Sequence, residues 1–110
     1  MDVRAKRVGE NEALFRRVNE QIEDVNEAFG GITGDFSIVC ECAEQTCVEQ
    51  ITVAVDTYEH VRADPTQFFV RPGHVNENVE DVIAREDEYW LVRKHEGEPA
   101  ELARELDARN

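Results

Sequence analysis

The feature that most limits the fold is a stripe of apolar residues near the N-terminus. Within residues 10–29, ENEALFRRVNEQIEDVNEAF, one apolar residue recurs every three or four positions: Leu14, Val18, Ile22, Val25 and Phe29. This spacing places the stripe on one side of an α-helix, which has 3.6 residues per turn. Gly30 and Gly31 follow, as is common where a helix ends. The sequence therefore predicts a helix over residues 10–29, preceded by a flexible N-terminus over residues 1–9.

Such a stripe needs a partner. It can pack on a sheet of the same chain, or residues 14–29 can pair with a second copy in a homodimer. Packing on a sheet of the same chain is the simpler alternative and the one we expect. A small domain buries a limited share of its surface, so a metal or a partner would add to its stability.

The rest of the chain predicts short elements. Apolar runs indicate strands at 36–40 and 48–55, an extended segment at 68–70, and a hairpin of 82–85 with 89–94 around the loop 86–88. Asp56 and Glu59 have the spacing of a capping box, which predicts a short helix ending near Ala63, before Asp64-Pro65. Residues 98–110 are expected to form a charged tail or short helix. The predicted fold is a single α+β domain over residues 10–97, with the long N-terminal helix on a small antiparallel sheet.

The three cysteines of the chain, Cys40, Cys42 and Cys47, fall within the segment VCECAEQTCVEQ. Cys40 and Cys42 are two apart on an extended segment, so their side chains point the same way. Residues 43–46 can then turn the chain so that Cys47 approaches them. Clustered thiolates are typical zinc ligands, and zinc in structural sites takes four. We therefore expect a Cys-rich zinc loop, with inert packing and redox chemistry as the alternatives.

The fourth ligand is predicted to be His74, because it directly follows the turn-forming pair Pro72-Gly73. His60, His95, Glu41 and water remain as alternatives. Three thiolates and a histidine would close the zinc shell and leave no open position for a substrate. The sequence also lacks a nucleophile-elbow or phosphate-binding glycine motif. We therefore do not expect an enzyme.

The net charge of the chain limits the classes of partner that it can bind. Asp and Glu number 25 against 12 Lys and Arg, for a net charge of −13. Such a field repels phosphate backbones, so no nucleic-acid binding is expected. No apolar run has the length of a membrane span or a secretory signal. An odd number of cysteines argues against a disulfide framework. We expect a cytoplasmic protein that does not bind membranes.

Several of these motifs occur together in a known pattern. FSIVCECAEQTCVEQI, YEHVRADPTQFFVRPGH and VIAREDEYWLVRK resemble segments of small, uncharacterised bacterial proteins from G+C-rich genomes with a CEC-x4-C and PGH pattern. The resemblance covers nearly all of residues 10–97 and departs from the pattern at Thr57. It implies that Cys40, Cys42, Cys47 and His74 belong together, and it implies no activity.

Two functions follow as hypotheses. The first is a non-catalytic acidic domain, held by a structural Zn²⁺, that mediates protein–protein interaction or regulation. The alternative is a thiol-based redox or metal-responsive sensor, in which oxidation of the cysteines or loss of zinc loosens the fold.

Overall fold

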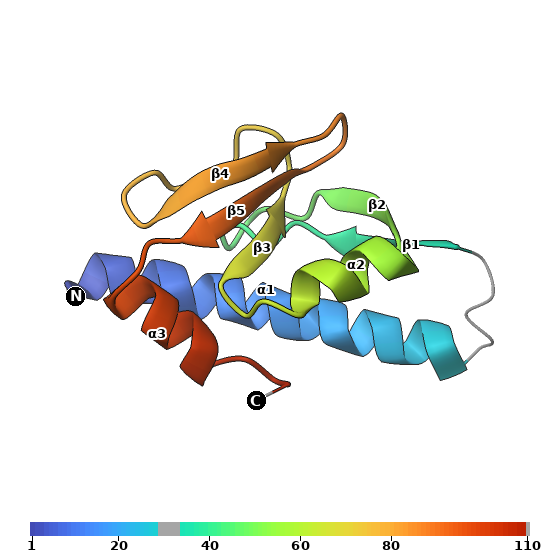
Figure 1. Ribbon diagram of the computed structural model, residues 1–110, viewed down its shortest axis with the longest axis horizontal. Coiled ribbons are helices and arrows are strands. Elements are labelled where there is room, and N and C mark those ends of the chain that lie inside the picture. The colour runs from blue at the N-terminus through green and yellow to red at the C-terminus, as the bar shows by residue number, and fades with distance from the viewer. Residues whose placement is uncertain (29–33, 110) are drawn as a thin grey trace.

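The computed structural model describes residues 1–28 and 34–109. In chain order the elements are α1 (Val3–Ala28), β1 (Asp35–Val39), β2 (Gln50–Ala54), α2 (Val55–Arg62), β3 (Gln67–Val70), β4 (Glu80–Arg85), β5 (Trp90–Lys94) and α3 (Glu98–Glu105) (Figure 1). The predicted α+β class is confirmed, with the long helix packed on small antiparallel sheets. None of the described helices is long and apolar enough to cross a membrane.

The strands form two antiparallel sheets rather than the one predicted. One sheet is the pair β1–β2, and the other has the order β3-β5-β4. A backbone hydrogen bond of 2.8 Å from Glu41 N to Phe69 O links the end of β1 to β3. Glu41 lies two residues beyond β1, between Cys40 and Cys42, so this bond joins the cysteine segment to β3.

Several boundaries differ from the prediction. Helix α1 begins at Val3, so most of the N-terminus expected to be flexible is helical; Phe29 and the glycine pair lie outside the described residues. The capping box is wrong: Ala54 is the N-cap of α2 and makes no side-chain cap. Asp56 already lies in the first turn. The β4–β5 loop includes Tyr89, whose carbonyl accepts from Glu86 N at 2.9 Å.

The core lies between both sheets and α2. Tyr58 of α2 is fully buried, stacks on Phe69 at a centroid distance of 5.7 Å, and meets Phe36 edge to face at 5.3 Å. Alternation along β1 and β2 buries Ile38 against Ile51, which are paired in register. One apolar cluster therefore joins the two sheets.

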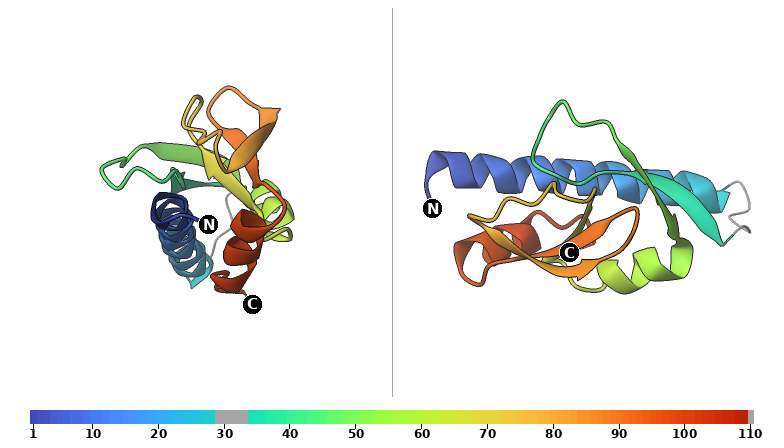
Figure 2. Two further views of the ribbon diagram at one scale, coloured as in Figure 1. Left: turned by 90° about the vertical axis from the view of Figure 1, so that its left-hand side faces the viewer. Right: turned by 90° about the horizontal axis from the view of Figure 1, so that it is seen from above.

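Helix α1 turns mainly another face to the core than the one predicted, although Ile22 of the predicted stripe packs against the core. Leu14 is 49% exposed and Val25 57%, while Val18 and Ile22 are half-buried. We call these four residues the outer stripe. The buried face instead carries mostly polar side chains: Gly9, Glu12, Ala13, Arg16, Asn19 and Glu23. Helix α3 and the β1–β2 sheet flank α1 and leave its outer side uncovered (Figure 2).

The polar face is buried because other elements supply partners. Glu12 pairs with Lys94, which also contacts Glu80 at 3.0 Å. Arg16 donates to the carbonyls of Pro65 and Ala103. A buried polar group costs little free energy when its hydrogen bonds are satisfied. These contacts outweigh the apolar stripe in choosing the face that α1 presents to the core.

Candidate metal centre

The segment Cys40-Glu41-Cys42 continues the line of β1 and sends alternate side chains in opposite directions. Cys40 N donates to Glu49 O at 2.9 Å, which continues the β1–β2 pairing by one more hydrogen bond. Beyond Cys42 the chain turns, and Cys47 N donates to Glu44 O at 3.0 Å. This turn returns Cys47 toward the first two cysteines.

Glu41 faces the interior, away from the cysteines, and is fully buried. Its Oε1 accepts from Phe69 N at 2.9 Å, and its Oε2 accepts from Asn19 Nδ2 at 2.8 Å. Burial raises the pKa of Glu41, while these two hydrogen bonds act against the increase. The side chain between the two cysteines thus ties their segment to both β3 and α1.

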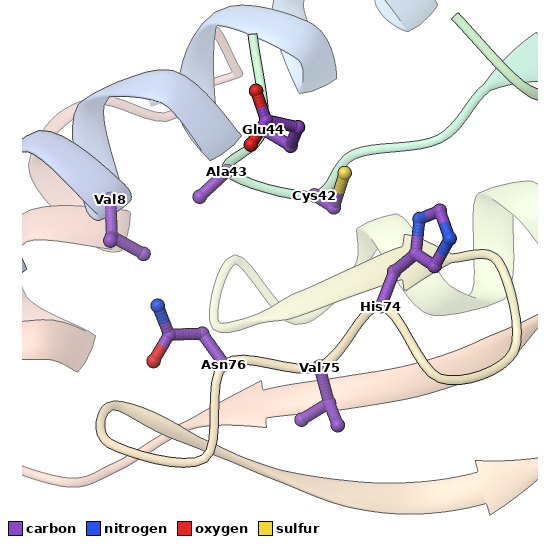
Figure 3. Close-up of a pocket in the computed structure, with 7 residues that line it drawn as sticks. All are labelled: Val8, Cys42, Ala43, Glu44, His74, Val75 and Asn76. Carbon is purple, nitrogen blue, oxygen red and sulfur yellow. The ribbon is translucent and has the colours of Figure 1, made fainter. Parts of the chain in front are cut away.

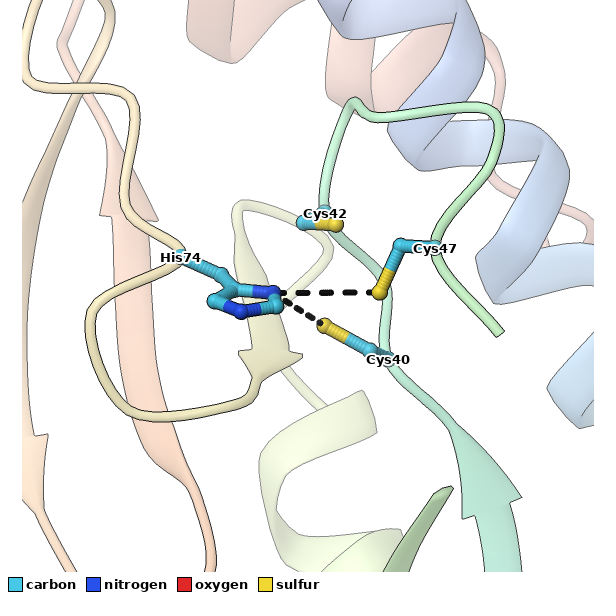
Figure 4. Close-up of side chains that lie close together, drawn as sticks. All are labelled: Cys40, Cys42, Cys47 and His74. Carbon is cyan, nitrogen blue, oxygen red and sulfur yellow. Dashed lines mark hydrogen bonds between the residues drawn. The ribbon is translucent and has the colours of Figure 1, made fainter. Parts of the chain in front are cut away.

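His74 reaches the cysteines from the loop that follows β3. Gly73 has a φ of +87°, a conformation that favours glycine, and His74 N donates to Arg71 O at 3.0 Å. This turn directs the imidazole of His74 back toward the cysteine segment (Figure 4). Two segments far apart in the sequence therefore meet at one point.

The four predicted residues, Cys40, Cys42, Cys47 and His74, form a compact group. One ligand atom of each lies within 4.8 Å of the corresponding atoms of the others. His74 Nδ1 is 3.6 Å from Cys40 Sγ and 3.7 Å from Cys47 Sγ. All three cysteines are free thiols. The structure brings together the set that the sequence indicated.

These distances fit a tetrahedral zinc site. With Zn–S near 2.3 Å and Zn–N near 2.0–2.1 Å, tetrahedral angles place sulfur and nitrogen about 3.6 Å apart. Both observed separations between His74 Nδ1 and a cysteine sulfur agree with that value. Three soft sulfur donors and one imidazole also suit zinc better than magnesium or calcium, which prefer oxygen. The group can therefore bind a metal through Cys40, Cys42, Cys47 and His74.

Further contacts orient these donors. Glu49 Oε2 lies 3.1 Å from His74 Nε2, the ring nitrogen that faces away from the sulfurs. A proton on Nε2 leaves Nδ1 with a free lone pair, which is the tautomer that a metal requires. Arg71 N donates to Cys40 Sγ at 3.2 Å. Spacing along the chain does not predict the contact of Glu49 with His74 or that of Arg71 N with Cys40 Sγ.

The thiols influence one another's ionisation. A hydrogen bond from Cys40 lowers the pKa of Cys42 to about 5. The same contact, with burial, raises the pKa of Cys40, and burial raises that of Cys47. Without a metal, negative charge concentrates on Cys42, and its neighbours remain protonated. A bound cation would be needed for all three to ionise together.

The alternative ligands lie elsewhere. His60 is exposed on α2, and His95 Nε2 lies 3.2 Å from Asp81 Oδ1. Glu41 points to the interior, as described above. Among the described residues, one other group has metal-ligand spacing, Glu23 with Glu27 and Glu59. Arg109 already pairs with Glu23 and Glu59, at 3.2 and 2.6 Å.

A cleft of about 490 Å³ adjoins the cysteine group. Cys42 and His74 lie on one side of it, and Val8 of α1 lies on the other (Figure 3). Cys47 is half-buried. Solvent therefore has access to the edge of the group.

Comparisons with protein-family models, with curated proteins and with solved structures find no match to this chain.

Proposed function

We propose that the protein is a non-catalytic domain whose Cys40, Cys42, Cys47 and His74 bind one structural Zn²⁺. The observation that carries this proposal is the agreement of the sulfur–nitrogen separations, 3.6 and 3.7 Å, with those around tetrahedral zinc. Zinc would link the segment after β1 to the loop after β3. It would thereby strengthen the connection between two sheets that share few backbone hydrogen bonds.

The donor set supports a structural role for the zinc. A catalytic zinc keeps a position for water or substrate, whereas four protein donors fill a tetrahedral shell. Three thiolates also donate enough charge to make the metal a weak Lewis acid. With a neutral His74, the loaded site would carry a net charge of −1.

The role in the cell that we propose is protein–protein interaction or regulation, in the cytoplasm. Two features support it: the net charge of −13 and the exposed part of the outer stripe. A reducing compartment keeps thiols available for zinc. The same negative charge disfavours nucleic acids and anionic membranes as partners.

The experiment that tests the zinc site is metal analysis of untagged protein purified without added metal. We expect about one zinc per chain, as the four-donor set requires. His74→Ala and Cys47→Ser should lower the zinc content or affinity, while His60→Ala, on the exposed histidine of α2, should not. A folded wild-type protein that contains no zinc and binds none on titration would contradict the proposal.

A second candidate is the thiol-based sensor, which the open cleft beside Cys42 and the half-buried Cys47 favour. In that reaction two thiolates give two electrons to hydrogen peroxide, so that an S–S bond forms and the O–O bond breaks. The peroxide takes up two protons and leaves as two waters, and the resulting disulfide no longer holds zinc. Release of zinc from the folded protein by stoichiometric peroxide would favour the sensor. Retention of zinc under the same conditions would favour the structural role.

A further inference from the structure

In the outer stripe of α1, Leu14 and Val25 are exposed and Val18 is half-buried, while the half-buried Ile22 packs at its inner edge against the core. Leu14 and Arg16 are two residues apart, and so are Glu23 and Val25, which corresponds to about 200° around a helix axis. The exposed ends of the stripe, Leu14 and Val25, therefore lie opposite the buried Arg16 and Glu23. Figure 2 shows α3 and the β1–β2 sheet beside α1, with another side of the helix left uncovered.

The spacing of this surface suits a second helix. Leu14, Val18, Gln21 and Val25 are separated by four, three and four residues. That is the repeat by which one α-helix packs along another. Gln21 is the polar member of the series and lies with Val18, Ile22 and Val25 around a shallow groove. The surface can thus receive a helix that runs along α1.

The residues beside the series indicate which helix fits. On one side Phe15 and Ile22 are half-buried and apolar. On the other side Arg17 and Asp24 are exposed, and neither forms an ion pair within the part of the chain that the structure describes. When two copies of α1 pack antiparallel about a twofold axis, Leu14 meets Val25 of the second copy, and Val18 meets its Gln21.

In the same arrangement the flanking residues also match. Residues on the same side of each series face one another in an antiparallel pair, so Arg17 meets Asp24 of the second copy and Phe15 meets its Ile22. The twofold axis generates each contact twice. A parallel pair would instead place Arg17 against the apolar Ile22. Charge complementarity therefore selects the antiparallel pair.

We propose that the interaction partner of this surface is a second copy of the chain, with α1 packed antiparallel on α1 through Leu14, Val18, Gln21 and Val25 and two Arg17–Asp24 ion pairs. The inference rests on the interaction role proposed above and not on the metal. Two helices bury less surface than the roughly 1,200–2,000 Å² of stable complexes. The dimer is accordingly expected to be weak and concentration-dependent.

Sedimentation equilibrium of the zinc-loaded full-length protein tests this proposal, over chain concentrations of about 5 to 500 µM. Wild type should approach twice the 12.6 kDa chain mass at the upper end. Arg17→Asp and Asp24→Arg each create like-charge contacts across the interface, so each should raise the dissociation constant by roughly tenfold. The double variant Arg17→Asp/Asp24→Arg reverses both partners and should restore wild-type association.

Leu14→Ser/Val25→Ser should abolish the dimer, whereas Ile83→Ser, at an exposed apolar residue of β4, should leave it unchanged. A wild type that stays monomeric at the highest concentration overturns the proposal. So does failure of the double charge reversal to recover association. Circular dichroism and zinc content measured on the same samples separate loss of the dimer from loss of folding or of the metal site.

Discussion

His74 Nε2 lies 3.1 Å from Glu49 Oε2, on the side of the imidazole opposite Cys40 and Cys47. The carboxylate fixes the ring and the position of its proton, so Nδ1 is left to bind the metal. We expect Glu49→Ala to weaken zinc affinity by about 10–100-fold, because such outer contacts contribute that much at other sites. Competition with a chromogenic chelator measures the change.

The matched control for Glu49→Ala is Glu77→Ala, which removes an exposed carboxylate three residues from His74. If both variants weaken zinc affinity equally, the effect of Glu49 comes from the negative charge of the surrounding surface and not from its contact with His74.

Glu41 is the side chain that holds the cysteine segment to the rest of the molecule. Glu41→Ala would leave Phe69 N without its side-chain acceptor and remove one of the partners of Asn19. We expect a loss of about 2–5 kcal/mol in the free energy of unfolding, measured by urea denaturation of the zinc-loaded protein. Glu44→Ala, on an exposed residue of the same loop, should cost about 1 kcal/mol or less. Equal losses in the two variants would contradict the role of Glu41.

Lys94 lies buried between the carboxylates of Glu12 and Glu80. Burial, and then repulsion from Glu80, raise the pKa of Glu12. Lys94→Met removes the cation and leaves two buried acids together, which should lower the free energy of unfolding by about 3–5 kcal/mol. Lys6→Met changes the only other lysine of the chain, on the exposed side of α1, and should have little effect. Urea denaturation at neutral pH compares the two variants.

Glu23 makes stability depend on pH. Burial, and then repulsion from Glu59, raise its pKa from 4.5 to about 7, although Arg109 acts in the opposite direction. The folded state therefore holds the proton more tightly than the unfolded state. The stabilisation is complete below pH 4.5 and is lost as the pH rises to about 7.

Glu23→Gln keeps an acceptor for Arg109 and cannot ionise. Relative to wild type, this variant should therefore become more stable as the pH rises from 5 to 8, within the window set by the two pKa values. Thermal unfolding of both proteins across this range gives the comparison. A difference in melting temperature that stays constant across this pH range would show that Glu23 has the same pKa in the folded and unfolded states.

Local patterns predicted most of the secondary structure and the members of the cysteine group. Alternation at Phe36 and Ile38 located β1 to within one residue, and the Pro-Gly turn before His74 pointed to the fourth donor. Both signals lie within a few residues of the feature that they predict. The prediction of a capping box was wrong because Asp56 lies two residues after the N-cap, Ala54, inside the first turn of α2.

The face of α1 could not be predicted from the helix itself. Periodicity measures where apolar residues gather, and here the buried positions are polar. Arg16 donates to the carbonyls of Pro65 and Ala103, and Glu23 Oε1 accepts from Arg109. These partners lie 49 to 87 positions further along the chain. No local window contains both members of such a pair.

The polar face of α1 also determines how far along its axis the helix can sit. A helix with an apolar inner face can shift along its axis by one turn at little cost, since one apolar side chain then takes the place of another. Here a slide in one direction would bring Arg16 to the place of Glu12, beside Lys94, and a slide in the other would bring Glu12 to the place of Arg16, beside the carbonyls of Pro65 and Ala103. The first slide would place two cations side by side, and the second would place a carboxylate against two carbonyl oxygens. The mostly polar inner face therefore fixes α1 at one position along its axis.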